Sequence, residues 1–227
     1  MIISCPLNAY ANIEVCKSMT ELDPRRFLTA LKHMGIDSYI FNRENLLTLP
    51  LLKKRVKECK KCSLADTRRN VVFGEGSSRA RLVFIGEAPG EDEDAQGRPF
   101  VGRAGKLLDR MIEKIGLRRE EVYICNVLKC RPPNNRDPEQ EEAKTCKEYL
   151  LAQLELIGPK IICTLGRHAY NTLLGVDESI TRIRGIPTKY KGTTVLPTYH
   201  PSFLLRNDNR VKEAWEDMER LKQLLRE

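Results

Sequence analysis

The side chains best suited to chemistry gather in a few short stretches of this sequence. Residues 86–102 combine glycines, prolines, acidic residues and an isolated aromatic side chain, Phe100. An amide at Asn126, a histidine at His200 and a basic loop over residues 129–136 come later. An amide can make a paired donor–acceptor contact with a base edge, an aromatic ring can stack on a base, and basic residues can hold phosphates. This combination is typical of a nucleobase pocket beside a nucleic-acid track.

The acidic residues allow two other interpretations. Carboxylates gathered in one stretch can bind a divalent metal ion for hydrolysis, as in a metal-dependent nuclease. Their confinement to one segment, without further acids at the other predicted strand ends, weakens this interpretation. The second alternative is a solvated acidic loop. The acids concerned are Glu87, Glu91, Asp92, Glu93 and Asp94.

Four of the 8 cysteines have spacings that suggest ligands. Cys59 and Cys62 form a C-x-x-C pair, Cys130 directly follows a predicted strand, and Cys146 lies within a predicted helix. Such thiolates can hold a structural zinc ion or a [4Fe–4S] cluster. A zinc ribbon would favour two C-x-x-C pairs, and four unligated buried cysteines are a further alternative. A redox role is disfavoured because this pair does not open a helix after a strand.

Alternating strands and helices must position these residues. Short apolar runs predict strands, and apolar residues at helical spacing predict helices. The predicted strands cover residues 82–85, 122–128 and 160–166, with a hairpin over 188–197 that turns at Lys191-Gly192. The predicted helices cover residues 25–34, 46–56, 104–115, 137–157 and 207–225, the fourth capped by Asp137. This order predicts an α/β fold with a parallel sheet and helices on both faces.

In parallel α/β sheets, ligands bind beyond the carboxyl ends of the strands. Glu87, Asn126 and His200 each come just after a predicted strand. We therefore expect the reactive side chains to meet along one edge of the sheet. Cys125 and Cys163 lie inside apolar strands and are expected to be core residues.

Length and composition describe an ordinary globular chain of 227 residues, with 41% hydrophobic and 31% charged residues. A net charge of +8 and a pI near 9.1 raise the expectation of a polyanionic partner. Residues 46–227 are predicted to form the catalytic domain, and residues 1–45 an N-terminal extension of unknown role. No apolar run reaches the ~18–20 residues needed to cross a bilayer. The N-terminus also lacks the layout of a secretory signal, so we expect a cytoplasmic location.

Several long segments, in the same order, make this sequence resemble the family 4 uracil-DNA glycosylases, the iron–sulfur enzymes of bacteria and archaea. The segments are Gly86–Glu91, Gly97–Gly102, Asn126–Arg136 and His200–Arg206. The resemblance runs from about Cys59 to the C-terminus. It implies a three-layer α/β/α sandwich with a central four-stranded parallel sheet, and removal of uracil from deaminated DNA. It also implies a [4Fe–4S] cluster held by Cys59, Cys62, Cys130 and Cys146.

The resemblance implies roles in base recognition. Phe100 would stack on a uracil flipped out of the duplex, and Asn126 would accept from its N3–H and donate to its O4. His200 would donate a hydrogen bond to O2 as negative charge develops on the departing base. Glu93 is placed where a bulky group excludes the methyl group of thymine. The residues expected to bind the base are Gly86, Ala88, Glu93, Phe100 and Asn126.

The resemblance leaves the activation of water open. Where the best-known uracil-DNA glycosylases have a catalytic aspartate, this sequence has Ala88. Glu87 is then the nearest carboxylate in the sequence, and Asn134 or Asn135 could orient the water. The catalytic set is therefore expected to be His200, Glu87 and Asn135.

Other residues are expected to contact DNA. Leu204 occupies the place where relatives insert a leucine wedge into the base stack. The DNA-binding residues are expected to be Leu204, Arg206, Arg131 and Asn134. His33 and His168 lie in predicted helices without a motif and are expected to be structural.

The expected function is that of a monofunctional uracil-DNA glycosylase that leaves an abasic site for base-excision repair. Its partners would be uracil-containing DNA, single- or double-stranded, and free uracil as product, and we expect a monomer. The sequence lacks the basic, histidine-containing insertion of a relative that traps DNA covalently, so simple turnover is expected. The alternative is a catalytically weak DNA-binding or damage-sensing module on the same fold.

Overall fold

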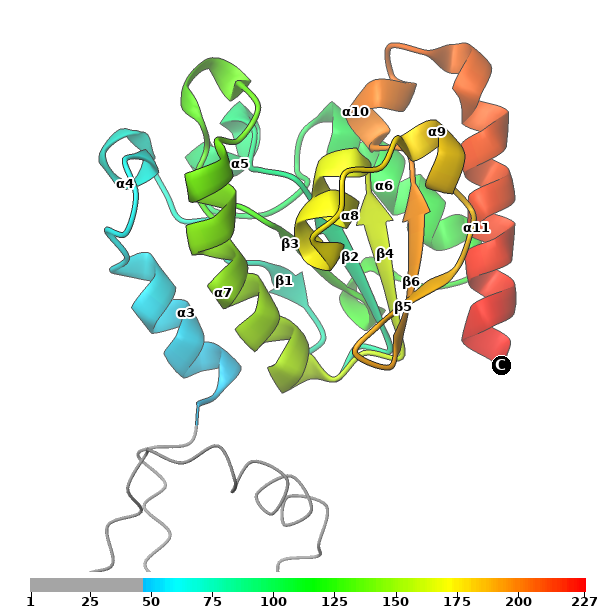
Figure 1. The fold of residues 1–227 in the computed structure, drawn as a ribbon, viewed down its shortest axis with the longest axis horizontal. Helices are drawn as coiled ribbons and strands as arrows, with labels where there is room; N and C mark the ends of the chain where they lie inside the picture. The colour runs from blue at the N-terminus through cyan, green and yellow to red at the C-terminus, as the bar shows by residue number, and fades with distance from the viewer. Residues whose placement is uncertain (1–46) are drawn as a thin grey trace, which may run out of the picture. The chain divides into compact units, whose positions relative to one another are not determined.

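The computed structural model describes residues 47–227 of the chain (Figure 1). The predicted boundary at residue 45, the helix predicted over residues 25–34 and His33 lie outside the described residues. Among the described residues, no helix has the length and apolar character needed to span a membrane.

The central feature is a six-stranded sheet with the order β1-β3-β2-β4-β6-β5. Its strands are β1 (Glu75–Gly76), β2 (Leu82–Gly86), β3 (Tyr123–Asn126), β4 (Ile161–Leu165), β5 (Thr188–Tyr190) and β6 (Thr193–Thr198). The inner strands β3, β2, β4 and β6 pair in parallel. The predicted four-stranded parallel sheet is therefore confirmed. Two short antiparallel strands, β1 and β5, extend it at its edges.

Helices cover both faces of the sheet and complete a three-layer α/β sandwich (Figure 1). One face packs on α6 (Arg103–Lys114) and α11 (Val211–Arg226), and the other on α7 (Gln140–Ile157) and α8 (Arg167–Leu174). The remaining helices are α3 (Leu49–Lys57), α4 (Leu64–Thr67), α5 (Glu91–Gln96), α9 (Ile180–Ile183) and α10 (Pro201–Leu204). Of these, α3 packs against α7.

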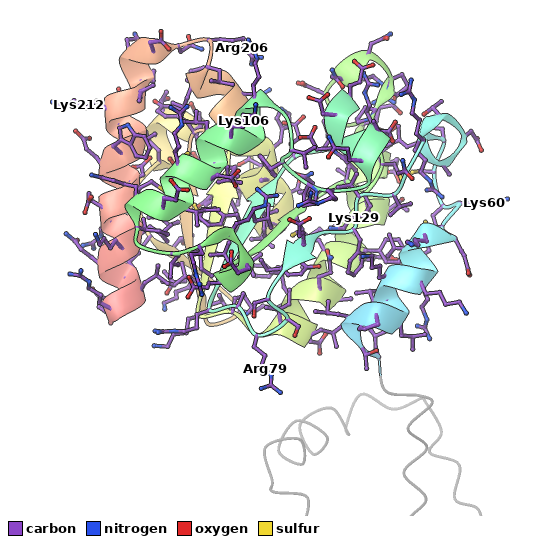
Figure 2. The ribbon with its side chains drawn as sticks, turned by 180° about the vertical axis from the view of Figure 1, so that it is seen from behind. Lys60, Arg79, Lys106, Lys129, Arg206 and Lys212 are labelled. Carbon is purple, nitrogen blue, oxygen red and sulfur yellow. The ribbon has the colours of Figure 1, made fainter. Side chains whose placement is uncertain are left out.

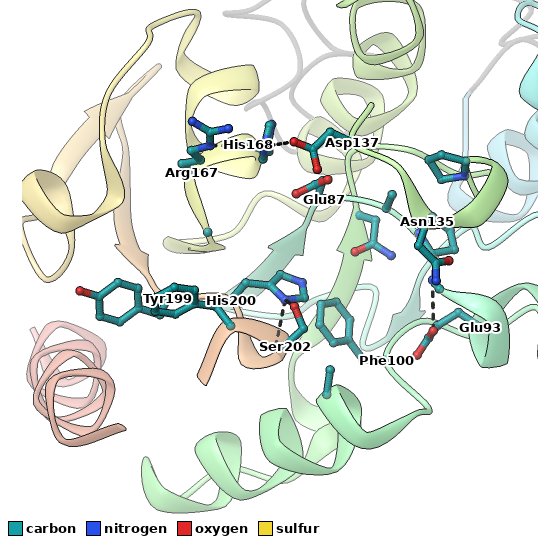
Figure 3. A pocket seen from close by; sticks show the side chains of 18 of the residues that line it. Glu87, Glu93, Phe100, Asn135, Asp137, Arg167, His168, Tyr199, His200 and Ser202 are labelled. Atoms are coloured by element: carbon teal, nitrogen blue, oxygen red, sulfur yellow. Dashed lines mark hydrogen bonds and ion pairs between the residues drawn. The ribbon is translucent and has the colours of Figure 1, made fainter. Parts of the chain in front are cut away.

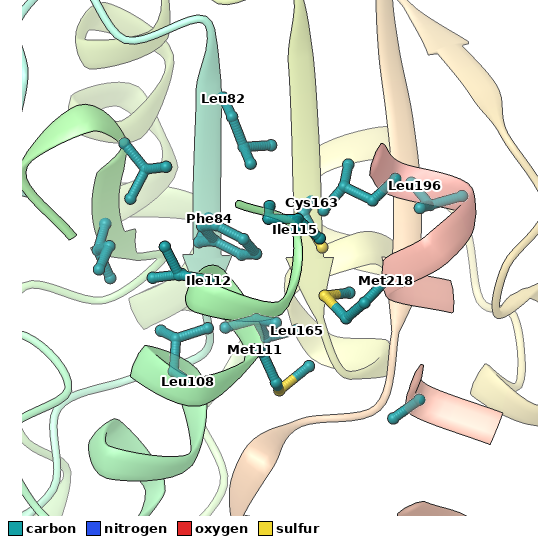
Figure 4. Packing of buried hydrophobic residues seen from close by; sticks show 14 of the residues in the cluster. Leu82, Phe84, Leu108, Met111, Ile112, Ile115, Cys163, Leu165, Leu196 and Met218 are labelled. Carbon is teal, nitrogen blue, oxygen red and sulfur yellow. The ribbon is translucent and has the colours of Figure 1, made fainter. Parts of the chain in front are cut away.

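The two faces of the sheet follow from the alternation of side chains along each strand. In β2, Leu82 and Phe84 point into the layer that holds α6 and α11 (Figure 4). Val83 and Ile85 point into the other layer. Every residue of β2 is buried, as expected for an inner strand of a parallel sheet. Cys125 and Cys163 are fully buried, which confirms them as core residues.

The predicted hairpin is confirmed, with Lys191 and Gly192 both at positive φ in its turn. The prediction for α7 was wrong at its start. Glu139, rather than Asp137, caps this helix, because its N–H donates to the Glu142 carboxylate at 2.9 Å. Arg136 holds that same carboxylate through two hydrogen bonds.

The segment that the sequence predicts as one loop, residues 86–102, contains the helix α5. All four residues of its first turn are acidic, which favours the N-terminal end of a helix because of the helix dipole. Gly97 ends it in the left-handed conformation, with φ of 68°. The acidic residues therefore form a helix rather than a solvated loop.

Candidate active site and cysteine cavity

A cavity of about 600 Å³ opens at the carboxyl ends of the parallel strands (Figure 3). Five residues predicted from the sequence line it together: Glu87, Phe100, Asn126, Asn135 and His200. They come from the end of β3 and from the segments that follow β2, β3 and β6. The prediction that reactive side chains meet at one sheet edge is therefore confirmed.

Asn126, the last residue of β3, is the buried polar group at the base of this cavity. Its side chain is 1% exposed, and its Oδ1 has no hydrogen-bond partner. The strand register places it beside Gly86. A Cβ atom on Gly86 would overlap Oδ1 of Asn126 and lie 2.6 Å from Cζ of Phe100. Glycine at this position therefore lets the amide and the ring approach each other.

Phe100 is held in a left-handed backbone conformation, with φ of 52°, which is uncommon for a residue other than glycine. The adjoining loop is fixed by Glu93, which also lines the cavity. Its carboxylate accepts from the backbone N–H of Val101 at 2.8 Å, of Gly102 at 3.1 Å and of Gly90 at 3.1 Å. Glu93 therefore shapes the loop that presents the ring, and its exclusion of thymine stays a prediction.

His200 lies opposite, with its ring centroid 5.6 Å from that of Phe100. Its Nδ1 accepts from the backbone N–H of Ser202 at 3.1 Å and lies 2.8 Å from the Ser202 hydroxyl. The ring proton of neutral His200 is therefore on Nε2, which is left as a donor. Burial, with a smaller effect of the Arg206 charge, lowers the pKa of His200 to about 4. The ring is accordingly neutral at pH 7.

Glu87 forms a cluster with two residues that sequence reasoning did not select for the site. One ligand atom each of Glu87, Asp137 and His168 lies within 4.8 Å of the others. Nε2 of His168 is 3.4 Å from Oδ2 of Asp137. Burial raises the pKa of Glu87; the Asp137 charge also raises it, and the charges of His168 and Arg167 lower it.

His168 and Arg167 line the cavity together with Asp137. The structure confirms that His168 lies in a helix, α8, and its expected structural role stays a prediction, but its place in the cavity wall was not predicted. One signal in the sequence could have found it: residues 167 and 168 follow the predicted strand that ends at Gly166, at the same sheet edge as the other site residues.

The acids of α5 do not form a metal site. Asp94 is 2% exposed and accepts from the backbone N–H groups of Arg69 and Asn70, while Glu93 is occupied as described above. In residues 47–227, the only trio of His, Cys, Asp or Glu with ligand atoms within 4.8 Å of one another is the one around Glu87. Among the described residues, the geometry does not support a metal site formed by the acids of α5, whereas Glu87 belongs to a trio whose spacing could hold a metal ion.

The loop after β3 presents Asn135 to the cavity and leaves Asn134 outside its lining. Both residues have a φ of 54°. Arg131 donates from Nε to Oδ1 of Asn135 at 2.8 Å and lies 3.7 Å from Glu91. Arg131 therefore orients the Asn135 amide, a role that its sequence position did not indicate.

The expectation that Leu204 is the wedge inserted into the base stack does not fit this structure. Its side chain is 2% exposed and belongs to the core cluster with α6 and α11, because the short turn of α10 points it inward. The next residue, Leu205, is 38% exposed. Arg206, which follows, lines the cavity as expected for a DNA-facing residue. Of these two leucines, Leu205 is therefore the one available to a partner.

The four cysteines singled out from the sequence surround a second, smaller cavity. Cys59, Cys62, Cys130 and Cys146 all line it, and all four are free thiols. Arg68 donates from Nη1 to Sγ of Cys130 at 3.1 Å, and the backbone N–H of Lys129 donates to Sγ of Cys146 at 3.3 Å. Burial raises the pKa of Cys146 to about 11.

The distances between these four sulfur atoms help to distinguish a zinc ion from an iron–sulfur cluster. A tetrahedral zinc ion with Zn–S bonds of about 2.3 Å needs sulfurs roughly 3.8 Å apart. Within the described part of the chain, no three cysteine sulfurs lie within 4.8 Å of one another. Four converging thiols with this wider spread, and with N–H donors on two of them, fit a multi-iron cluster better than a single zinc ion.

Comparisons with known proteins agree with this geometry. The family model described as "Uracil DNA glycosylase superfamily" matches residues 73–219. A type-4 uracil-DNA glycosylase of Thermotoga maritima is 49% identical over 191 residues, which cover 82% of this chain and 98% of that protein. Type-4 uracil-DNA glycosylases of Sulfurisphaera tokodaii and Archaeoglobus fulgidus are 50% and 45% identical, over 78% and 75% of this chain and 84% and 90% of theirs. The chain therefore belongs to the uracil-DNA glycosylase superfamily, within its type-4 family.

Proposed function

We propose that this chain is a monofunctional uracil-DNA glycosylase, which hydrolyses the N-glycosidic bond of uracil in DNA and leaves an abasic site. The observation that carries the proposal is the buried, unpartnered Oδ1 of Asn126 beside Phe100 and the neutral His200. A buried acceptor without a partner is costly unless a ligand supplies the donor. The N3–H of a flipped uracil is such a donor.

Selectivity for uracil follows from the same amide. Asn126 would accept from N3–H and donate to O4, whereas cytosine presents an acceptor at N3 and a donor at N4. Binding of cytosine would leave these buried groups unpaired, and sites of this kind reject the wrong partner strongly. Phe100, 5% exposed and fixed by its loop, provides the face on which the base stacks.

Departure of the base places negative charge on the uracil ring, chiefly at O2. Nε2–H of His200 is the donor aimed at that oxygen, because Ser202 occupies Nδ1. A neutral donor, placed before the reaction begins, stabilises the developing charge without a proton transfer. His200 therefore acts as an oxyanion-stabilising residue rather than as a general acid.

The attacking water would be held near Glu87 and Asn135, which both line the cavity. Ala88 stands where the best-known uracil-DNA glycosylases have a catalytic aspartate. Because this carboxylate is missing, stabilisation of the leaving group supplies most of the rate acceleration. The sugar bears positive charge as the bond breaks. Ionised Glu87 can stabilise that charge by electrostatic attraction as well as orient the water.

We assign a [4Fe–4S] cluster to Cys59, Cys62, Cys130 and Cys146, in a structural role. When bound, the cluster would cross-link the segment before α4, the loop after β3 and helix α7. Iron content and broad visible absorbance near about 400 nm test this assignment. A colourless protein that carries one zinc ion would overturn it.

For DNA, we propose that Arg206, Arg167 and Arg136 at the cavity wall hold phosphates, and that Leu205 fills the space left by the flipped nucleotide. Asn134 and Arg131 flank this track on the loop after β3. We place the catalytic unit in residues 46–227, acting as a monomer in the cytoplasm.

The test is release of free uracil by cluster-loaded protein from U:G, U:A and single-stranded oligonucleotides, with C- and T-containing strands as controls. Mass spectrometry detects the base, and alkali cleavage detects the abasic sites. We expect release only from uracil-containing DNA, and it should continue in the presence of a chelator of divalent ions. Absence of release would favour a DNA-binding or damage-sensing module; strand breaks that stop with chelator would favour a nuclease.

A further inference from the structure

Lys129 is a fully buried lysine between the two cavities. Its side chain is 1% exposed, in contrast to solvent-facing basic residues such as Lys60 and Arg79 (Figure 2). Among residues 47–227, no carboxylate lies within ion-pair distance of its ammonium group. Lysine is almost never fully buried unless it is paired. This residue therefore has a specific partner or a specific purpose.

The hydrogen bonds of Lys129 point in two directions. Its Nζ donates to the backbone carbonyl of Asn126 at 2.6 Å. Its own backbone N–H donates to Sγ of Cys146 at 3.3 Å, and the residue lines the cysteine cavity. One residue thus contacts both the strand end that carries the buried amide and a thiol assigned to the cluster.

The surroundings of Lys129 explain what could balance its charge. Cys130 and Cys146 lie beside Lys129 in the lining of the cysteine cavity. Cys130 and Cys146 belong to the cluster set, and a cluster held by four thiolates is net negative. Arg68 and Lys61 also line this cavity; Arg68 donates to Cys130 and to two backbone carbonyls, and none of these hydrogen bonds involves Asn126.

The segment between Asn126 and Lys129 is short and well defined. The amide of Val127 donates to Gly86 O at 2.9 Å, and the amide of Leu128 donates to Glu87 O at 3.0 Å. These two bonds join the segment to the loop that begins the active site. Nζ of Lys129 donates to the carbonyl of Asn126. The peptide group between Asn126 and Val127 is therefore held at both its N–H and its C=O.

We propose that Lys129 is a positioning residue that couples the cysteine cavity to the base-recognising strand end: its side chain holds Asn126 in register, and that hold depends on occupancy of the cavity. The role of Asn126 in base recognition rests on the proposed function, whereas the coupling between the cysteine cavity and this strand end does not. Loss of the cluster would leave Lys129 as a buried cation without negative charge nearby. Lys129 would then move, and Asn126 with it.

The test is hydrogen–deuterium exchange over residues 126–128, in wild type and Lys129→Met, each with and without the cluster. Cluster removal should speed exchange there about tenfold in wild type and much less in Lys129→Met, whose loaded form already exchanges faster. Arg68→Met, the matched control at the same cavity, should hold the cluster less well yet keep wild-type exchange at residues 126–128 when loaded. Lys129→Gln, smaller and uncharged, serves if the methionine variant does not fold.

Equal acceleration by cluster removal in wild type and Lys129→Met would overturn the proposal, as would exchange that rises throughout the protein. Neither result requires that the protein release uracil, so failure of the proposed function is seen separately in the wild-type assay. With activity present, loaded Lys129→Met should lose kcat by about 10- to 100-fold with little change in KM, because a small displacement of Asn126 misplaces the base. The surface variant Lys144→Met should keep the wild-type kcat.

Discussion

The large cavity lined by Asn126 and His200, which we call the base pocket, shares the loop after β3 with the cysteine cavity, yet the polar groups of the two are arranged in opposite ways. In the base pocket, the buried Oδ1 of Asn126 has no partner, and Nε2–H of His200 faces open space. In the cysteine cavity, Arg68 and the backbone of Lys129 already donate to sulfurs.

This difference distinguishes a site built for an exchanging ligand from one built for a resident group. The pocket is completed only when a ligand brings a donor and an acceptor, so binding is selective and reversible. The cysteine cavity has its outer hydrogen bonds in place, as is usual around metal centres whose ligands must stay oriented.

The largest effect is expected from the donor at His200. His200→Ala should lower kcat about 10²- to 10³-fold, as removal of an oxyanion-stabilising donor does elsewhere. Affinity for DNA should change little, because Arg206 and the other basic residues remain. Single-turnover uracil release and fluorescence anisotropy with labelled DNA measure the two effects.

His168→Ala is the matched control, since His168 lines the same cavity but pairs with Asp137 rather than facing Phe100. It should lower kcat only a few-fold. Comparable losses in the two variants would show that His200 has no special role in leaving-group stabilisation.

The two leucines of the α10 segment should give opposite results. Leu204→Ala should lower the free energy of unfolding by about 2–5 kcal/mol, because it empties a buried core position. Leu205→Ala, at an exposed position, should change stability by less than about 0.5 kcal/mol. Urea unfolding of cluster-loaded protein measures both.

On duplex substrates, Leu205→Ala should reduce uracil release several-fold, with a smaller effect on single-stranded DNA, which does not require a base to leave a stack. A variant at Leu205 that acts on both substrates like wild type would contradict its role as a wedge.

Gly86→Ala tests how closely the pocket must pack. A methyl group there has no space beside Asn126 and Phe100, and displacements of about 1 Å at a reacting site can cost roughly 100-fold in rate. We expect a loss of that order in kcat, with the cluster absorbance unchanged. Wild-type turnover by a well-folded Gly86→Ala protein would mean that the ring and the amide do not need this approach.

Much of this arrangement was predictable because it depends on local signals. Apolar runs that alternate with apolar residues at helical spacing predicted the parallel sheet, and the rule for strand ends placed Asn126 and His200 at one edge. Inner strands of a parallel sheet, such as β2, are recognisable in the sequence because they are buried on both faces and lack polar side chains.

The rest depended on tertiary contacts that spacing does not encode. Asp137 fits the pattern of a helix cap, but Arg136 and Glu142 organise that turn and free Asp137 to meet His168. Leu204 and Leu205 are chemically identical, and only the direction of the short helix α10 decides which is buried. In the sequence, nothing distinguishes Lys129 from the other basic residues of its loop, because only the structure shows that it is buried.

The remaining prediction concerns the pH dependence of stability. The pKa of His200 is lowered to about 4 in the folded chain, mainly by burial, from an ordinary value of 6.5. The unfolded chain therefore binds a proton below pH 6.5, whereas the folded chain binds it only below about pH 4, so stability falls as the pH drops through this window. Relative to His200→Gln, wild type should lose up to about 3 kcal/mol between pH 7 and pH 4.

The pairing of wild type with His200→Gln removes contributions that both proteins share, including those of the cysteines and carboxylates. Urea unfolding at each pH gives the difference directly, and that difference should level off below about pH 4. A difference that does not vary with pH would mean that His200 keeps an ordinary pKa in the folded chain. The neutral imidazole, and with it the free Nε2–H donor of the base pocket, would then have to be established in another way.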